Sequence, residues 1–151
     1  MYAKLLAARP TVVLAPMAGV TNRAFRRVCR EASAAVLGEN STHDGTIYVA
    51  EMTTSQASLM RNAESISLIA FDQDESPRSV QLYGVDPVVV GAAVRMVVDE
   101  DRADHIDLNF GCPVPKVTRK GGGSALPWKS DLFGDIVRAA VDNAQDKVPV
   151  T

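Results

Sequence analysis

The residue of this sequence best suited to chemistry is Cys112, which stands in a Gly-Cys-Pro turn at residues 111–113. The turn directly follows residues 105–109, a run with strand character. A thiol there could transfer a proton or act as a nucleophile. A nucleophilic cysteine needs a base, and the two histidines are His43, in a polar loop, and His105, at a strand start. Both histidines are better explained as structural or solvent-facing, so general acid is the favoured role for Cys112.

A basic, glycine-rich segment follows this turn at residues 116–124 and contains Lys116, Arg119 and Lys120. It lacks the Gly-Lys-Ser/Thr ending of a phosphate-binding P-loop. Two interpretations stand side by side. The segment is either a mobile surface loop or a flexible arm that contacts phosphates beside Cys112.

Further distinctive side chains stand near the ends of the other strand-like runs. They are Pro16, Met17, Ala18, Glu51, Gln81 and Asn109. Simpler explanations exist for several of them: Pro16 could shape a turn, Met17 could be core, and Glu51 could be a solvated loop carboxylate. Gln81 is harder to explain, because it lies between Val80 and Leu82 in a strand that should be apolar. Its amide could bind the edge of a heterocycle through donor and acceptor together.

Strands and helices alternate along the chain. Strand character occurs at residues 11–15, 47–50, 78–83 and 105–109, with a fifth start at 148–151. Helical periodicity occurs at residues 21–36, 87–98 and 131–145, and more weakly at 54–62. Residues 38–45 resemble a polar loop, and residues 67–71 could form either an extra strand or part of an irregular excursion. This order predicts a parallel α/β fold.

The three clear helices each carry an apolar stripe that we expect to be buried. In residues 21–36 the stripe comprises Ala24, Phe25, Val28, Cys29 and Ala32, and the opposite side carries Arg23, Arg26, Arg27 and Arg30. Cys29 is therefore expected to be an inert core residue. Asp86 before Pro87, and Ser130 before Asp131, are the expected N-caps of the other two helices.

Two parallel architectures compete. A Rossmann domain should have a glycine fingerprint after its first strand, but residues 15–22 read APMAGVTN, with one glycine. A (β/α)8 TIM barrel needs about 250 residues, and this chain has 151. The chain is either a small open sheet or, as we favour, the N-terminal part of a barrel with about four to five βα units.

Composition restricts the class of protein and the expected cellular location. With 46% hydrophobic and 23% charged residues, the chain is typical of a soluble globular domain. The net charge of −2 predicts no strong affinity for nucleic acid by itself. No apolar run approaches the roughly 20 residues of a membrane span, and residues 1–10 lack a secretory signal. Two cysteines make neither a disulfide scaffold nor a zinc site, so no metal is expected. A cytoplasmic location is the default.

Three motifs resemble the tRNA-dihydrouridine synthases. They are APMAGVTNRAFR at 15–26, SVQLYG at 79–84 and DLNFGCPVPKVTRKGGGSAL at 107–126. The resemblance implies an FMN-binding barrel, followed in the family by a helical domain that helps to hold tRNA. The implied reaction reduces the C5–C6 double bond of uridines in tRNA to 5,6-dihydrouridine, with NADPH re-reducing the flavin.

The resemblance also assigns roles. Pro16, Met17 and Ala18 would lie against the flavin, Gln81 would hydrogen-bond its ring, and Asn109 would lie near flavin and uracil. Cys112 would be the proton donor. By position, Lys116, Arg119 and Lys120 would lie near the RNA, as would Arg23 and Arg26 if they reach the barrel mouth, and Glu51 is a further candidate for substrate or RNA contact.

The domain is therefore expected to be a partial FMN-binding barrel over residues 1–151, without the second barrel half and the helical RNA-binding domain. We expect this piece alone to bind FMN weakly, to have little or no activity and, with an open sheet edge, to aggregate. Two alternatives remain: another FMN barrel oxidoreductase acting on a free pyrimidine or enone, and a non-catalytic fragment. The uridine position and the oligomeric state do not follow from the sequence.

Overall fold

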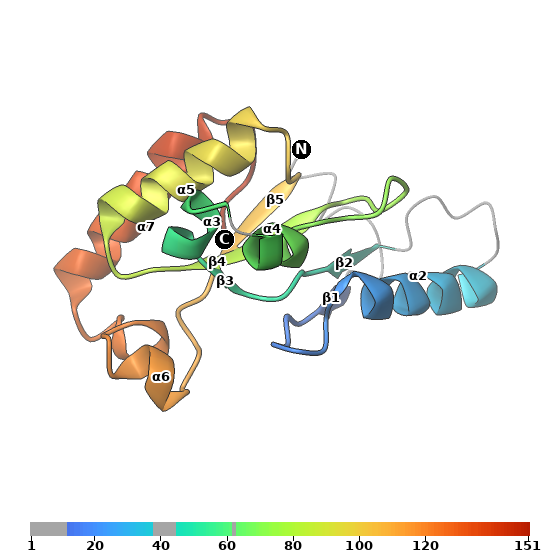
Figure 1. Ribbon diagram of the computed structural model, residues 1–151, viewed down its shortest axis with the longest axis horizontal. Helices are drawn as coiled ribbons and strands as arrows, with labels where there is room; N and C mark the ends of the chain where they lie inside the picture. Colours follow the sequence, from blue (N-terminus) through green and yellow to red (C-terminus); the bar gives the residue numbers. More distant parts are fainter. Residues whose placement is uncertain (1–11, 38–44, 62) are drawn as a thin grey trace.

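The computed structural model describes residues 12–37, 45–61 and 63–151 (Figure 1). Its strands are β1 (Val12–Leu14), β2 (Thr46–Tyr48), β3 (Thr53–Thr54), β4 (Ser79–Tyr83) and β5 (His105–Leu108). Its helices are α2 (Arg23–Leu37), α3 (Ser55–Leu59), α4 (Ala63–Leu68), α5 (Pro87–Asp99), α6 (Pro115–Thr118) and α7 (Ser130–Ala144), with a 3₁₀ turn η1 (Gly123–Ala125).

All strand pairings are parallel. β1 pairs with β2, and β3, β4 and β5 form a second ladder in that order. A parallel bridge between Val49 and Ser79 connects the two ladders. Beyond β5, Val150 bridges to Ile106, and the amide of Leu108 donates to Thr151 O at 2.8 Å. The strand ends after β4 and β5 therefore lie at one edge, as parallel βα units require.

The expected strands are confirmed at all four main positions, and the fifth start at 148–151 joins β5 as a bridge. The extra strand at 67–71 is wrong, because Ala63–Leu68 is helix α4. The short strand β3 was not expected. The loop predicted at 38–45 falls mostly on residues 38–44, outside the described part of the chain.

The core lies between the sheet and helices α5 and α7. Val80, Leu82 and Ile106 of β4 and β5 are fully buried and pack with Val94 and Ile136 of these helices. Figure 1 shows α5 and α7 side by side along one side of the sheet. Their predicted apolar stripes are buried only in part: Ala93, Met96 and Val97 of α5 and Ile136, Ala140 and Ala144 of α7 are buried, whereas Val88, Ala92 and Val141 are exposed. Each helix thereby fixes the strand that precedes it.

The helix starts agree only in part with the sequence. Asp86 caps α5 as expected, because its carboxylate accepts from the amides of Val88 and Val89 at 2.9 and 3.4 Å. Ser130 is not the cap of α7. The helix already includes Ser130, and Lys129 holds the cap position without a side-chain hydrogen bond.

The orientation predicted for α2 is wrong. Arg26, on the expected outer side, is 0% exposed, whereas Val28 of the apolar stripe is 61% exposed and Phe25 is 37% exposed. The physical reason is an acidic neighbour. Asp72 and Glu75 lie against the basic side of the helix and pair with its arginines. Cys29 is only partly buried, so it is not a core residue here. No helix among the described residues is long and apolar enough to span a membrane.

Candidate functional site

Gln81 and Asn109 meet at the C-terminal ends of β4 and β5. Asn109 Nδ2 donates to Gln81 Oε1 at 3.0 Å, and Gln81 Nε2 donates to Asp107 Oδ2 at 2.5 Å. Gln81 and Asp107 are paired in register across the two strands, which places their side chains on the same face of the sheet. Asn109 Nδ2 also lies 3.5 Å from Met52 Sδ. Residues from three neighbouring chain segments therefore converge at this point.

The side-chain amides of Gln81 and Asn109 each have one possible orientation, which is fixed by the groups at the two ends of this series of hydrogen bonds. A carboxylate such as Asp107 only accepts hydrogen bonds, and a backbone amide only donates them. Asn109 Oδ1 accepts from the amides of Gly111 and Cys112 at 3.2 and 3.0 Å. Gln81 must therefore turn its NH2 toward Asp107, and Asn109 must turn its oxygen toward the turn.

Cys112 is held through its backbone on both sides. Its amide is bound by Asn109, and its carbonyl oxygen accepts from the amide of Ser124 at 3.0 Å. Gly123 lies over the same carbonyl with φ +54, and a Cβ there would collide with the Cys112 oxygen. Only glycine fits this left-handed position without a shift. The backbone that carries the partly buried Cys112 side chain is therefore held in place.

Tyr83 is a neighbour of Cys112 that the sequence did not single out. Burial raises the pKa of the Tyr83 hydroxyl, and the negative charge that Cys112 can carry raises it further. Tyr83 is half-buried. Its phenol stays protonated at neutral pH and remains a hydrogen-bond donor beside the thiol.

The loop after β1 is tied to the second strand region. Met17 O accepts from the amides of Val20 and Thr21, both at 3.0 Å, and the Thr21 hydroxyl accepts from the amide of Met17 at 2.9 Å. The amide of Gly19 donates to the carboxylate of Glu51. Glu51 is buried, so it is not a solvated loop carboxylate. Met17 is 40% exposed, which leaves an apolar surface at this end of the strands.

Comparison with known proteins decides the family. Residues 13–151 match the model of the family described as dihydrouridine synthase (Dus). The chain belongs to the dihydrouridine synthase family. The parallel βα units are accordingly the first part of a TIM barrel, and both expectations, the family and the fold class, are confirmed.

Curated members of the dihydrouridine synthase family support the match. The chain is 54% identical over 141 residues to a probable tRNA-dihydrouridine synthase of Mycobacterium tuberculosis, which covers 93% of this chain and 35% of that protein. It is 41% identical over 140 residues to tRNA-dihydrouridine synthase B of Pseudomonas aeruginosa (93% and 38%). A probable tRNA-dihydrouridine synthase of Aquifex aeolicus is 34% identical over 131 residues (87% and 38%). The chain spans a little over a third of the length of these relatives.

The structure brings some of the residues of the family motifs together and leaves others apart. Gln81, Asn109 and Cys112 are brought together by hydrogen bonds. The loop of Pro16, Met17 and Ala18 is tied to Glu51 through the amide of Gly19, and the sulfur of the next residue, Met52, lies 3.5 Å from Asn109 Nδ2. The expectation that Arg26 could reach RNA is wrong, because its guanidinium is fully buried against Glu75 and donates to Thr21 O at 2.9 Å. Arg26 instead stabilises the loop after β1 through its hydrogen bond to Thr21 O.

The basic segment of the chain is folded into turns. Lys116 lies in α6, Arg119 ends that helix, and the amide of Gly122 returns to Val117 O at 3.2 Å. Val117 is buried beneath the segment. Lys116, Arg119 and Lys120 are exposed. The segment is therefore not an extended arm, although its cations do face solvent next to Cys112.

A polar chain also continues to the other end of the strands. His105 is buried, and its Nδ1 lies 2.7 Å from Ser79 Oγ, while its Nε2 lies 2.9 Å from Thr151 Oγ1. The Thr151 hydroxyl in turn donates to Asp107 Oδ1 at 3.1 Å. Burial lowers the pKa of His105, and the charge of Asp107 opposes this. The structural role expected for His105 fits these contacts, whereas His43 lies outside the described residues.

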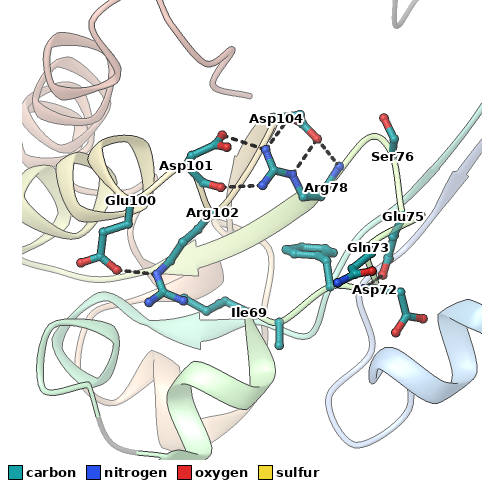
Figure 2. Close-up of a pocket in the computed structure, with 12 residues that line it drawn as sticks. Ile69, Asp72, Gln73, Glu75, Ser76, Arg78, Glu100, Asp101, Arg102 and Asp104 are labelled. Atoms are coloured by element: carbon teal, nitrogen blue, oxygen red, sulfur yellow. Dashed lines mark hydrogen bonds and ion pairs between the residues drawn. The ribbon is translucent and has the colours of Figure 1, made fainter.

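The cleft drawn in Figure 2 is not the candidate site. It has a volume of about 710 Å³ and lies at the N-terminal ends of the strands, where it is lined by residues 69–73, 75, 76, 78, 100–102 and 104. Its arginines are already paired: Arg78 Nη2 lies 2.9 Å from both Asp101 and Asp104, and Arg102 Nε lies 2.6 Å from Glu100. Within the part of the chain that the structure describes, no group of three or more His, Cys, Asp or Glu residues could hold a metal.

Sequence reasoning missed three residues that shape the site: Asp107, Tyr83 and Arg26. Asp107 could have been found, because it stands two residues before Asn109 on the same face of a strand and is charged where an apolar residue is usual. Arg26 gave no such signal, because its partner Glu75 is 49 residues away.

Proposed function

We propose that this chain is the flavin-binding and proton-donating part of a tRNA-dihydrouridine synthase, which reduces the C5–C6 double bond of uridine in tRNA. The observation that carries the proposal is the fixed turn of Cys112 beside the Gln81–Asn109 amide pair. A half-buried thiol beside oriented amides at strand ends fits proton transfer to a planar heterocycle.

FMN fits the residues at this edge. Gln81 has one N–H and one lone pair of its oxygen beyond the bonds to Asp107 and Asn109, and their orientation is set. The exposed side chain of Met17, with Pro16 and Ala18 beside it, offers an apolar surface for a flat ring. We assign Pro16, Met17, Ala18, Gln81 and Asn109 to the flavin, with NADPH as the external reductant.

Bound FMN would supply the hydride that uracil receives at C6. Carbon C5 must then take up a proton, and we assign this proton to the thiol of Cys112, which stands in the turn bound by Asn109. Asn109 keeps the thiol-bearing turn in position through the bond from the Cys112 amide. The target base must leave its stack to reach these groups.

The exposed cations Lys116, Arg119 and Lys120 serve this function as phosphate contacts next to the proton donor. Glu51 is assigned to the support of the loop after β1 rather than to RNA, because its carboxylate is buried on Gly19. The complete flavin pocket and the tRNA surface would belong to a longer protein of the size of the curated relatives.

The test replaces each cysteine in turn in the full-length product of the gene. Cys112→Ala should lower the rate of dihydrouridine formation in tRNA from a strain without its own synthases by about 100-fold or more. Cys29→Ala, the matched control at a partly buried position of α2, should keep the wild-type rate. An undiminished rate in Cys112→Ala would remove Cys112 as the proton donor. Reduction of free uracil but not of tRNA would favour the other FMN barrel enzymes.

A further inference from the structure

Trp128 is the most exposed large hydrophobic residue described in this chain, at 90% of its surface. It does not hang from a loose segment. Leu126, two residues earlier, is fully buried in the core, and the amide of Lys129 donates to Leu126 O at 2.9 Å. The amide of Phe133 then joins Lys129 O at 2.9 Å, where α7 begins. The indole is therefore held outward by an ordered turn, and the described residues leave it uncovered.

Positive charge predominates on the segment that precedes and includes Trp128, and the first acidic residue after it is Asp131 in the first turn of α7. Residues 108–130 contain four of the sixteen Lys and Arg residues and none of the eighteen acidic residues. The remainder of the chain thus has twelve cations against eighteen acids, a net charge of −6. The four cations are Lys116, Arg119, Lys120 and Lys129, and none forms an ion pair with a described residue. Eight arginines elsewhere are paired.

This basic surface is continuous with the site of Cys112. Lys129 Nζ lies over the turn after α6, 3.0 Å from the place where a Cβ of Gly121 would stand. The amide of Ser124 binds Cys112 O at 3.0 Å, so the same turns that hold the cations hold the thiol. Figure 1 shows α6 and its connections projecting from the body of the molecule, between β5 and α7.

We propose that Trp128, with Lys116, Arg119, Lys120 and Lys129, forms a docking surface for an unstacked stretch of RNA, in which the indole stacks on a base. The inference rests on the proposed function for the presence of RNA at Cys112, and it adds an aromatic contact. Aromatic side chains next to unpaired cations are the combination that binds single-stranded nucleic acid, because the cations take the phosphates and the ring takes a base. A protein partner would more often meet an aromatic anchor surrounded by neutral residues.

The experiment uses the fact that Trp128 is the only tryptophan of the 151-residue chain. Tryptophan fluorescence is followed while a single-stranded, uridine-rich oligoribonucleotide is added at several salt concentrations. We expect saturable quenching, with an affinity that falls steeply as salt rises. Inorganic polyphosphate should compete for the cations without the same quenching, because it has no base to stack.

Variants separate stacking from charge, with the dissociation constant measured by the polarisation of a labelled oligonucleotide. Trp128→Ala should weaken binding about tenfold or more, and Trp128→Phe should restore most of the loss. Lys120→Ala should weaken binding and reduce its salt dependence, whereas Lys147→Ala, an exposed cation outside the surface, should leave both unchanged.

Three results would overturn the inference: no quenching by RNA, equal quenching by polyphosphate, or equal affinity in Trp128→Ala. An indole that proves insensitive to RNA but is quenched by a protein partner would likewise overturn it. The proposed function would survive each of these results, because the Cys112→Ala test measures proton donation independently.

Discussion

Arg26 and Glu75 form an ion pair that is shut off from solvent, with Arg26 Nε 2.6 Å from Glu75 Oε1 and side-chain exposures of 0% and 1%. The same guanidinium donates to Thr21 O and to Ala70 O at 2.9 and 2.8 Å, and it lies 4.8 Å from the centre of the Phe71 ring. One side chain thus connects the loop after β1 with the segment that precedes β4. The pair determines where Met17 and its neighbours lie.

Arg26→Met should lower the free energy of unfolding by about 3–5 kcal/mol, because it leaves Glu75 as a buried charge without a partner. Arg27→Met is the matched control one position along the same helix. Arg27 is half-exposed and pairs with Asp72, so its loss should cost less than about 1 kcal/mol. Urea denaturation followed by circular dichroism measures both. Similar losses in the two variants would contradict the role given to the buried pair.

Gly123→Ala should displace Cys112. The added Cβ would meet the Cys112 carbonyl at a backbone φ of +54, so both crowding and strain oppose it. We expect a loss of stability of about 1–3 kcal/mol and a changed rate of thiol alkylation at Cys112. In Gly134→Ala, within α7, the new Cβ meets nothing within 4 Å, so this control should leave alkylation unchanged.

Asp107→Asn should weaken the fixed orientation of the side-chain amides of Gln81 and Asn109. Asparagine both donates and accepts, so it no longer forces the NH2 of Gln81 to face residue 107. Asn109 would then hold the Cys112 turn less firmly. We expect alkylation of Cys112 to become several-fold faster, with Cys29 in the same molecule as the internal reference. Asp135→Asn, on an exposed helix surface, should have no such effect, and an unchanged rate in Asp107→Asn would show that the turn does not depend on the amide chain.

His105 should make the stability depend on pH. Its pKa is lowered in the folded protein, chiefly by burial, so below its ordinary value of 6.5 the unfolded chain takes up a proton that the folded chain does not. The free energy of unfolding should therefore fall with acidification below about pH 6.5, by at most about 1.4 kcal/mol per pH unit, until His105 protonates in the folded state. The measurement compares wild type and His105→Gln at pH 7.5 and 5.5. An equal change in both proteins would exclude His105 as the cause.

Much of the framework could be predicted because its signals are local. Alternating strand and helix periods located β4, α5, β5 and α7, and the parallel order brought Gln81, Asn109 and Cys112 to one edge. Pairing of β4 with β5 in register required nothing more than the βα rule. The site residues were found because polar types at strand ends conflict with an apolar strand.

The errors have a common physical cause, which is contact between distant segments. The apolar stripe of α2 predicted burial of Val28, but the acidic residues at 72 and 75 drew the opposite side of the helix inward. Periodicity cannot indicate which side will find a charged partner 45 or more residues away. The same limit hid the bond between Glu51 and Gly19, which are 32 residues apart.

The hydrogen bond from the Thr151 hydroxyl to Asp107 bears on the order in which contacts of the site can form during translation. The carboxylate of Asp107 accepts hydrogen bonds from Gln81, which precedes it, and from Thr151, which follows it by 44 positions. It can therefore accept both bonds only after Thr151 has been synthesised. During translation, the carboxylate that orients the site amides leaves the ribosome with one of its partners still to come. The nascent chain therefore presents its strands in sequence, but Asp107 can gain the hydrogen bond from Thr151 only after residues 148–151 have emerged.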